Sequence, residues 1–546
     1  MTGEGSILSQ KPDVTLETLH KIFTIPESED STLGQIEKKI SENLLGFLKE
    51  HIVSAETTPA NLERMFREFK VPEDPVFVSE QAEFLLNNVV SQSVHTASPR
   101  FVGHMTSALP YFMLPLSKMM IALNQNLVKI ETSKSFTPLE RQVIGMVHHL
   151  IYGNSTMFYK RHTQDHEVAL GTFCSNGTIA NITSLWVALN KCFPPRKDFA
   201  GVSEDGLHTA LQEYEKDGAV ILVSQRGHYS LSKAANLLGI GKRNLISIPT
   251  DDRNKIQVDV LREQVLRFKQ ENKAIIAIVG IAGTTETGSV DPLSKIADLC
   301  QAEDIHFHVD AAWGGPTLFS STHRSKLRGI ETADSVTFDA HKQLYVPMGA
   351  AFAVFRDKGD LACIEHHAEY IIRKGSRDLG RKSLEGSRPG MAMLVHSGFR
   401  IIGRRGYEML IDMGIDKAQL FAKMIQEAPD FELITKPELN ILTYRYVPEN
   451  VQKVLGTASY EEQRRLNDHL NRLTVTIQKE QRDKGKNFVS RTALQPVKYD
   501  RKTINVFRVV LANPLTKEKH LLEILDEQRK IARTLMRGES WSKTGT

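Results

Sequence analysis

A lysine and an aspartate, each next to a short apolar run, suggest a specific chemistry. Lys342 follows the run Ser335-Val-Thr-Phe, and Asp310 closes Ile305-His-Phe-His-Val about thirty residues earlier. The lysine amine can bond to an aldehyde. A carboxylate about 4 Å from a ring nitrogen, at an effective dielectric constant of roughly 20, stabilises the protonated ring by about 4 kcal/mol and raises its pKa by about three. The pair therefore predicts pyridoxal 5'-phosphate, an aldehyde cofactor with a ring nitrogen.

A phosphate site is predicted where a helix begins. The segment Ser175-Asn-Gly-Thr-Ile-Ala-Asn opens a helix that runs through Leu189. Small residues at a helix N-terminus expose N–H groups and the positive end of the helix dipole, which together bind phosphate. The predicted contacts are Asn176, Gly177, Thr178 and, beside the lysine, His341. The alternative is that this segment is a simple helix cap.

Three more residues follow predicted strands and are assigned to the same cofactor. His228 comes after the strand 219–224, and its imidazole can stack on a flat heteroaromatic ring. A structural histidine without such a contact is the alternative. Thr284 and Ala312 come after the strands 274–279 and 305–309.

Near-continuous apolar runs separated by helical stretches predict an α/β fold, with a mostly parallel central sheet and helices on both faces. The runs are 219–224, 274–279, 305–309, 335–338 and 350–355, and 293–300 is one of the helices between them. Ligands bind at the carboxyl ends of the strands in such sheets. His228, Thr284, Asp310 and Lys342 are therefore expected to gather along one edge of the sheet.

The pattern divides the chain into three parts. Residues 1–90 are predicted to form a helical segment that packs on another body, such as a second subunit. Residues 91–395 form the large cofactor-binding domain, and residues 396–546 form a smaller α+β domain. In the last part we expect a long helix over 395–413, strands near Glu432 and over 505–510, and a charged C-terminal helix.

Composition excludes several classes of function. The formal net charge of +4 is small for 546 residues, and no recognition motif is present, so nucleic acid is not an expected partner. Four cysteines, none in a CxxC pair, are typical of a reduced cytoplasmic enzyme. No apolar signal segment follows Met1, and the longest apolar stretch, 274–282, is too short to span a bilayer. We therefore expect a cytoplasmic protein that does not bind membranes.

A metal site is the alternative to an organic cofactor. His306, His308 and Asp310 alternate along one strand and share a face, as in the H-x-H site of amidohydrolases. Such a site needs further ligands on later strands, which offer only His341. We therefore predict no metal. A partial phosphate loop, Gly239-Ile-Gly-Lys, lacks the leading glycine of a nucleotide site.

The sequence resembles the group II pyridoxal-dependent decarboxylases in five segments that follow one another in the family's order. These segments are Ser175-Asn-Gly-Thr-Ile-Ala-Asn, His228-Tyr-Ser, Gly283-Thr-Thr-Glu-Thr-Gly-Ser-Val-Asp, His308-Val-Asp-Ala-Ala-Trp-Gly-Gly and His341-Lys. The resemblance covers residues 90–400 and extends through Phe507-Arg-Val-Val-Leu-Ala-Asn-Pro. It implies a fold-type-I enzyme that forms a homodimer with active sites between the subunits.

Within this family the chain is most similar to the branch of bacterial aspartate 1-decarboxylases and glutamate decarboxylases. The resemblance assigns the segment Ser98-Pro-Arg-Phe-Val-Gly-His-Met, with His104, to the substrate pocket, and Arg508 to the arginine that binds the substrate carboxylate. A fixed guanidinium can bind a carboxylate through two hydrogen bonds. A surface salt bridge is the alternative for Arg508.

The implied reaction is α-decarboxylation of an acidic L-amino acid, with L-aspartate giving β-alanine and carbon dioxide. Glutamate giving γ-aminobutyrate is the alternative, because the two substrates differ by one methylene, which a pocket discriminates by only about 1–3 kcal/mol. Another fold-type-I activity, such as transamination or desulfuration, and a non-catalytic oligomer that keeps the fold are further alternatives.

The chain departs from the family at two places. Asn176 stands where the family often has glycine. The segment from Ile371 to Glu385 lacks the tyrosine that, in the family, returns a proton to the carbon that has lost carbon dioxide. Tyr370 is the nearest tyrosine, and His228 is another candidate donor. The sequence leaves the identity of the proton donor open.

Overall fold

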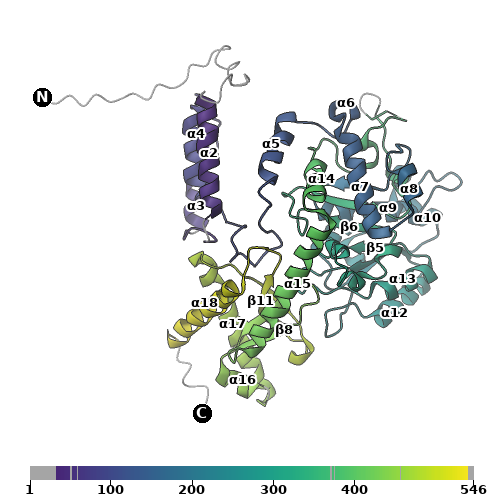
Figure 1. Ribbon diagram of the computed structural model, residues 1–546. Helices are drawn as coiled ribbons and strands as arrows, with labels where there is room; N and C mark the ends of the chain where they lie inside the picture. The colour runs from purple at the N-terminus through teal and green to yellow at the C-terminus, as the bar shows by residue number, and fades with distance from the viewer. Residues whose placement is uncertain are drawn as a thin grey trace. The chain divides into compact units, whose positions relative to one another are not determined.

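The computed structural model in Figure 1 describes residues 32–49, 52–57, 59–368, 372–373, 375–455 and 457–538. These residues form two compact units. The first contains the described residues of 32–102, 475–489 and 515–538, and the second contains those of 103–474 and 490–514. The residues assigned singly to the cofactor or the substrate, including His104 and Arg508, belong to the second unit, whereas residues 98–102 of the segment assigned to the substrate pocket belong to the first.

The second unit is built on a seven-stranded sheet in the order β1-β7-β6-β5-β4-β2-β3. Its strands are β1 (Gly171–Cys174), β2 (Ala219–Ser224), β3 (Leu245–Ile248), β4 (Ala274–Ile281), β5 (Phe307–Asp310), β6 (Ser335–Asp339) and β7 (Ala351–Phe355). The neighbours from β6 through β3 pair in parallel. The predicted α/β fold with a mostly parallel sheet is therefore confirmed.

Both faces of this sheet are apolar because alternate residues of each strand point to opposite sides. In β2, Val220 and Leu222 join the core on one face, whereas Ile221 and Val223 join the core on the other. The first core includes residues of α7 (Phe136–Tyr152), α12 (Val258–Gln270) and α13 (Leu293–Glu303). The second includes residues of α9 (Gly177–Cys192) and α11 (Tyr229–Leu237). These helices surround the sheet in Figure 1.

Three features of the sheet differ from what the apolar runs alone predict. β7 pairs antiparallel with both β6 and β1, although its run resembles those of the parallel strands. Only a short connection without an α-helix joins β6 to β7, and a parallel pair needs a longer crossover. The four-residue edge strands β1 and β3 were not predicted, because runs this short give little periodic signal.

A smaller antiparallel sheet in the same unit has the order β10-β11-β9-β8. Its strands are β8 (Phe431–Thr435), β9 (Ile441–Tyr446), β10 (Ser490–Leu494) and β11 (Ile504–Val510). The two strands predicted near Glu432 and over 505–510 are β8 and β11. Arg508 lies within β11, opposite Ser490 of β10 and Thr443 of β9.

The long helix predicted over 395–413 is wrong as a single element. The structure has two helices there, α14 (Ala392–Ile401) and α15 (Gly403–Glu427). Gly403 adopts a left-handed conformation with φ of 69°, which a continuous right-handed helix cannot contain. The hydrophobic period continues across the break, so the period alone did not reveal it.

The other α-helices of the second unit are α5 (Met113–Leu123), α6 (Ile130–Ser133), α8 (Thr156–His162), α10 (Val202–Glu213), α16 (Glu449–Leu455) and α17 (Tyr460–Lys484), whose last residues belong to the first unit. Short 3₁₀ turns are η2 (Lys242–Asn244), η3 (Gly315–Phe319), η4 (Arg324–Leu327), η5 (Ile330–Thr332), η6 (Asp360–Ile364), η7 (Leu379–Lys382) and η8 (Val497–Tyr499).

The first unit is helical in its described part. It contains α2 (Thr32–Lys49), α3 (Pro59–Met65), α4 (Val78–Leu85), the π-helical turn η1 (Leu86–Val90) and the C-terminal helix α18 (Glu518–Gly538). Residues 1–31 of the predicted N-terminal helical segment lie outside the described residues. Among the helices that the structure describes, none combines the length and the apolar character needed to cross a membrane.

Candidate active site

A cavity of about 460 Å³ opens at the carboxyl ends of β2, β4, β5 and β6. Its wall contains ten of the eleven residues that the sequence assigned to cofactor and substrate: His104, Asn176, Gly177, Thr178, His228, Asp310, Ala312, His341, Lys342 and Arg508. His228, Asp310, Ala312, His341 and Lys342 come together because parallel strands deliver the residues at their carboxyl ends to one edge of the sheet, whereas Arg508 comes from the smaller sheet.

Thr284 is the one predicted residue that does not line the cavity, although its neighbours Gly283 and Thr285 do. Its side chain is fully buried, and its hydroxyl lies 2.7 Å from the Thr287 hydroxyl and accepts the Ser289 N–H. These hydrogen bonds hold the turn that follows β4. A cofactor contact of Thr284 stays a prediction.

Asp310 is held by a buried hydrogen-bond network. Its Oδ2 accepts the Asn181 amide at 2.9 Å, and its Oδ1 accepts the Ala312 N–H at 3.2 Å. Asn181 comes from α9, one turn after Gly177, and its Oδ1 in turn accepts from Thr337 and His308. These hydrogen bonds fix the Asp310 carboxylate at the end of β5, in the wall of the cavity.

His228 is attached to the same network. The Asn181 amide also donates to the Ser230 hydroxyl at 2.9 Å, and this hydroxyl lies 2.8 Å from His228 Nδ1. The Ser230 backbone N–H donates to Nδ1, so this nitrogen carries no proton. Burial lowers the pKa of His228, partly offset by the charge of Asp310. The neutral ring therefore carries its proton on Nε2.

Lys342 and His341 share a carboxylate that the sequence analysis did not single out. Lys342 Nζ lies 3.0 Å from Asp339 Oδ2, and His341 Nε2 lies 3.6 Å from the same oxygen. His341 Nδ1 donates to the Ala350 carbonyl at 2.8 Å. Burial lowers the pKa of His341, so its ring is neutral. Asp339 is almost fully buried, and its Oδ1 has no hydrogen-bond partner.

The N-terminus of α9 has the form expected of a phosphate site. Asn176 caps the helix, because its Oδ1 accepts the Ile179 N–H at 3.1 Å. In the described part of the chain, the N–H groups of Gly177 and Thr178 have no acceptor, and both residues line the cavity. A Cβ at position 177 would lie 2.7 Å from Asp339 Oδ2, so glycine is required there. The first turn of α9 therefore combines a capping side chain, that of Asn176, with two backbone N–H groups that are free to donate.

Arg508 enters the cavity from β11. Its Nε–H donates to the Thr285 carbonyl at 2.6 Å, and its Nη1 donates to the Gly103 carbonyl and the Ser490 hydroxyl. Its Nη2 is buried without a hydrogen-bond partner. Burial lowers its pKa to about 10, which leaves the guanidinium charged at neutral pH. The alternative of a surface salt bridge is wrong, because Arg508 is buried and forms no salt bridge with any residue that the structure describes.

His104 lies in the same part of the wall and is neutral. Burial lowers its pKa, and the nearby positive charges of Arg508 and Lys342 lower it further. Its Nδ1 lies 3.4 Å from the Thr106 hydroxyl.

The histidines of the metal alternative are engaged in protein hydrogen bonds. His308 uses Nδ1 with the Ser335 hydroxyl and Nε2 with Asn181, and His306 Nε2 also lies 2.8 Å from the Ser335 hydroxyl. Burial lowers the pKa of His306 to about 3 and of His308 to about 4. Among the residues described, no group of three or more His, Cys, Asp or Glu side chains could hold a metal ion. His308 instead orients Asn181 and, through it, Asp310.

Comparison with known families decides what this constellation is. The model of the family described as "Pyridoxal-dependent decarboxylase conserved domain" matches residues 59–447, which is more than half of the chain. The chain belongs to this family. Its cofactor is pyridoxal phosphate, and it is an amino-acid decarboxylase, as the sequence predicted.

Two relatives show how far the similarity extends. An aspartate 1-decarboxylase of Aliivibrio fischeri is 57% identical over 522 residues, which cover 95% of each chain. The acidic amino acid decarboxylase GADL1 of Xenopus tropicalis is 28% identical over 459 residues, which cover 83% of this chain and 82% of that one. The alignment with the first relative therefore includes both units of the structure.

A solved structure shares the fold. Mouse CSAD in its apo form has a TM-score of 0.77 and 24% sequence identity, covering 91% of this chain and 98% of that chain. The predicted fold-type-I architecture is thus confirmed.

The residues of the cavity fit the family's cofactor. Among the side chains that line it, Lys342 supplies the only amine. The carboxylate of Asp310 is fixed by two hydrogen bonds, and the free N–H groups of Gly177 and Thr178 can donate hydrogen bonds to a phosphate. The cavity thus contains a suitable partner for each of the cofactor's ring nitrogen, aldehyde and phosphate.

Sequence reasoning missed several groups that line the same wall or support it. Asn181 lies in the motif that signalled the helix start, but its role depends on the distant His308 and Asp310. Asp339 stands three residues before Lys342, a spacing that brings the two together in the turn after β6. Arg226 and Glu286 line the cavity from the turns after β2 and β4.

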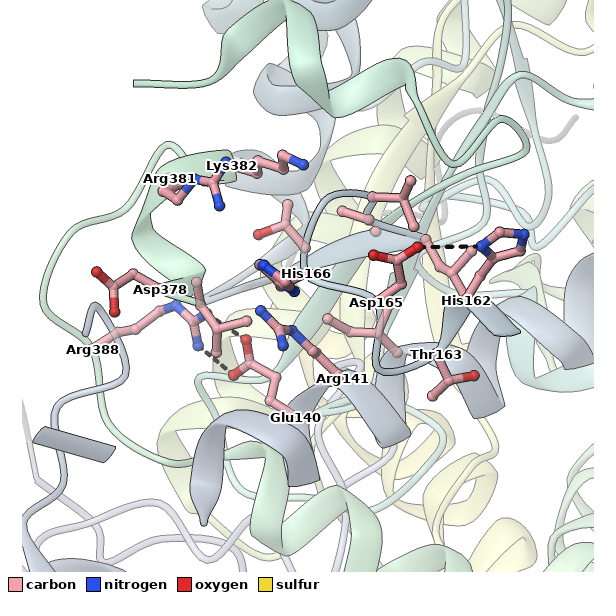
Figure 2. A pocket seen from close by; sticks show the side chains of 17 residues that line it. Glu140, Arg141, His162, Thr163, Asp165, His166, Asp378, Arg381, Lys382 and Arg388 are labelled. Atoms are coloured by element: carbon pink, nitrogen blue, oxygen red, sulfur yellow. Dashed lines mark hydrogen bonds and ion pairs between the residues drawn. The ribbon is translucent and has the colours of Figure 1, made fainter. Parts of the chain in front are cut away.

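A second, much smaller pocket of about 40 Å³ lies between α7, α8 and η7 (Figure 2). Figure 2 shows Arg388 paired with Glu140, and Asp165 facing His162. His162 Nδ1 lies 3.7 Å from Asp165 Oδ2. Arg388 donates to both carboxylate oxygens of Glu140. A volume of this size holds about one water molecule. We therefore interpret the cluster as a structural ion pair.

Replacing Glu140 by glutamine is expected to lower the free energy of unfolding by about 3–5 kcal/mol, because it leaves the buried Arg388 without its counter-charge. Urea denaturation of the holoenzyme measures this change. Glu427→Gln is the matched control, since Glu427 forms an exposed ion pair with Lys423 and should change stability very little. Equal stability of Glu140→Gln and the native protein would contradict the interpretation.

Proposed function

We propose that this protein converts L-aspartate to β-alanine and carbon dioxide. The observation that carries the proposal is the buried guanidinium of Arg508, which lies in the cavity of Lys342 with Nη2 free to bind a carboxylate. The 57% identity to a protein named aspartate 1-decarboxylase supports the choice of substrate. An amino acid with a second carboxylate is the ligand that matches both Lys342 and the Arg508 guanidinium of this cavity.

We assign the cofactor contacts as follows. Lys342 would bond to the cofactor aldehyde, Asp310 would hold the proton of the ring nitrogen, and His228 would contact the ring. The N–H groups of Gly177 and Thr178 bind the phosphate, with Asn176, His341, Thr284 and Ala312 as further contacts. When bound, the cofactor takes up the electron pair that the departing carboxylate leaves behind.

The protein contributes orientation and proton transfer. Arg508 holds the side-chain carboxylate, and the neutral His104 can donate a hydrogen bond to the same group. Holding one carboxylate in a fixed position orients the other for departure, which is a large part of catalysis. His228 carries a proton on Nε2 and is a candidate to return it to the substrate carbon. Tyr370, the other candidate, lies outside the described residues.

Arg508→Lys is expected to lower kcat/KM for aspartate about 100-fold. Lysine keeps the charge but loses the two-pronged donor and the hydrogen bonds to Thr285 and Gly103. Steady-state carbon dioxide release measures the change. Arg491→Lys, an exposed arginine on the same cavity wall, is the matched control and should keep kcat/KM within about threefold. Full activity of Arg508→Lys would show that another group binds the carboxylate.

Glutamate is the second candidate substrate, since the GADL1 relative is named for acidic amino acids in general. Its side chain is one methylene longer, which a pocket discriminates by only about 1–3 kcal/mol. Incubating the holoenzyme with each amino acid and separating β-alanine from γ-aminobutyrate distinguishes the two. Carbon dioxide without keto acid is expected, and formation of keto acid would indicate transamination instead. Lack of the yellow colour of the bound cofactor after purification would favour the non-catalytic alternative.

We further propose that the chain acts in the cytoplasm as a homodimer with active sites at the subunit interface. We also propose that the boundaries between the domains of the chain lie at residues 90 and 395. Light scattering of the purified protein should give twice the mass of the 61.4 kDa chain, and a monomeric mass would contradict the dimer.

A further inference from the structure

Three charged side chains in the active-site cavity each have a buried polar atom without a hydrogen-bond partner. They are Arg226 at Nε, Glu286 at Oε2 and Arg508 at Nη2. All three line the same cavity. Buried polar atoms in folded proteins are nearly always paired, so three unpaired ones around one cavity indicate a ligand with matching groups.

The three side chains come from separate elements but are close enough to interact electrostatically. Arg226 lies in the turn after β2, two residues before His228, and Glu286 lies in the turn after β4. The same turn provides the Thr285 carbonyl that accepts from Arg508. Glu286 is the acid that stabilises the charged forms of both Arg226 and Arg508. No hydrogen bond or salt bridge joins the three within the described part of the chain.

The sum of these three charges indicates which charge the ligand must carry. Two guanidinium groups and one carboxylate leave a net charge of +1 in this part of the cavity. An uncompensated charge away from bulk water is unfavourable, and a single further carboxylate would neutralise it. Within this group of three, Glu286 would already balance Arg508, so Arg226 supplies the excess positive charge.

We propose that Arg226 is a specificity-determining residue that binds the side-chain carboxylate of the substrate together with Arg508, while Glu286 is the counter-ion that keeps the local charge at +1. The inference rests on the proposed function in taking the ligand to be an acidic amino acid. It adds a second guanidinium to the substrate site and explains why an acidic residue lines a site for an anion.

Succinate is the probe for this inference, because it has two carboxylates and no amine that could react with the cofactor. Its dissociation constant is measured by calorimetry on the native holoenzyme, on Arg226→Gln and on the double variant Arg226→Gln/Glu286→Gln. We expect Arg226→Gln to weaken succinate binding about tenfold to 100-fold, the range for loss of a charged hydrogen bond. The double variant restores the +1 charge but not the hydrogen bonds of Arg226, so it should bind succinate about three- to tenfold more tightly than Arg226→Gln.

The steady-state kinetics with aspartate should change in the same direction as succinate binding. In Arg226→Gln the loss in kcat/KM for aspartate is expected mainly in KM, with the absorbance and affinity of the bound cofactor unchanged. Unchanged succinate binding in Arg226→Gln would overturn the proposal, and so would a double variant that binds succinate no better than the single one. A purely structural role of Arg226 predicts this last result, because a second substitution would not repair the fold.

The same experiment separates this inference from the proposed function. If the native enzyme released no carbon dioxide from aspartate or glutamate, the proposed function would fail, while the loss and recovery of succinate binding would still support a dicarboxylate site. If the native enzyme decarboxylated aspartate but Arg226→Gln bound succinate normally, only the inference would fail.

Discussion

Replacing Lys342 by methionine is expected to lower kcat by about four orders of magnitude or more, which corresponds to about 5.5 kcal/mol of transition-state stabilisation. Lys342 provides the only amine among the residues that line the cavity, and its Nζ lies 3.0 Å from Asp339 in the turn after β6. Methionine has a similar length but cannot bond to an aldehyde, so covalent attachment of the cofactor is lost.

Lys233→Met is the matched control, since Lys233 is an exposed residue of α11 that lies over the Tyr229 ring. It should keep native activity and native cofactor absorbance. Borohydride reduction of the native holoenzyme followed by peptide mapping should place the label on Lys342. A label on a different lysine, or substantial activity in Lys342→Met, would refute the assignment.

Replacing Asp310 by asparagine is expected to lower kcat about 1,000-fold. A carboxylate about 4 Å from the ring nitrogen stabilises its protonated form by about 4 kcal/mol, and each 1.36 kcal/mol is about a factor of ten in rate. Asparagine keeps the size but has only one side-chain oxygen, so it can accept from either Ala312 or Asn181 and not from both. The expected loss therefore combines the charge with one hydrogen bond. Stopped-flow measurement of carbon dioxide release gives kcat.

Asp291→Asn is the control for replacing a buried aspartate outside the cavity. Burial raises the pKa of Asp291 to about 7, and its oxygens accept the N–H groups of Ile256 and Ile281. This variant should lose stability but keep kcat. If Asp310→Asn retained more than about a tenth of native kcat, the proton on the ring nitrogen would have to be held by another group.

Much of the fold could be predicted because its signals are local. The runs at 219–224 and 274–279 are almost continuously apolar, and each became a strand of the sheet. The helix after Ser175 has its cap in the sequence itself, in the side chain of Asn176. The break at Gly403 was not predicted, because glycine adopts positive and negative φ about equally readily, so its presence alone does not show which one the chain takes.

The site could be predicted to the level of its cofactor, and less completely at its substrate end. Lys342, Asp310 and His228 each follow a strand, and parallel topology alone brings such residues to one edge. The hydrogen bonds that orient Asp310 through Asn181 and His308 connect three separate elements. No local pattern indicates which buried polar groups will meet.

By itself, the sequence determined the parallel sheet, the edge where chemistry occurs and the lysine and aspartate that suit the cofactor, because each is encoded within a few neighbouring residues. Only the tertiary structure decided that β7 runs antiparallel, that Asp339 lies against Lys342, and that Arg226, Glu286 and Arg508 line one cavity. The last three residues are separated by up to about 280 positions in the chain. Their proximity follows from the order of the strands and the packing of the smaller sheet, and their unpaired polar atoms exist only because burial removes the water that would otherwise solvate them.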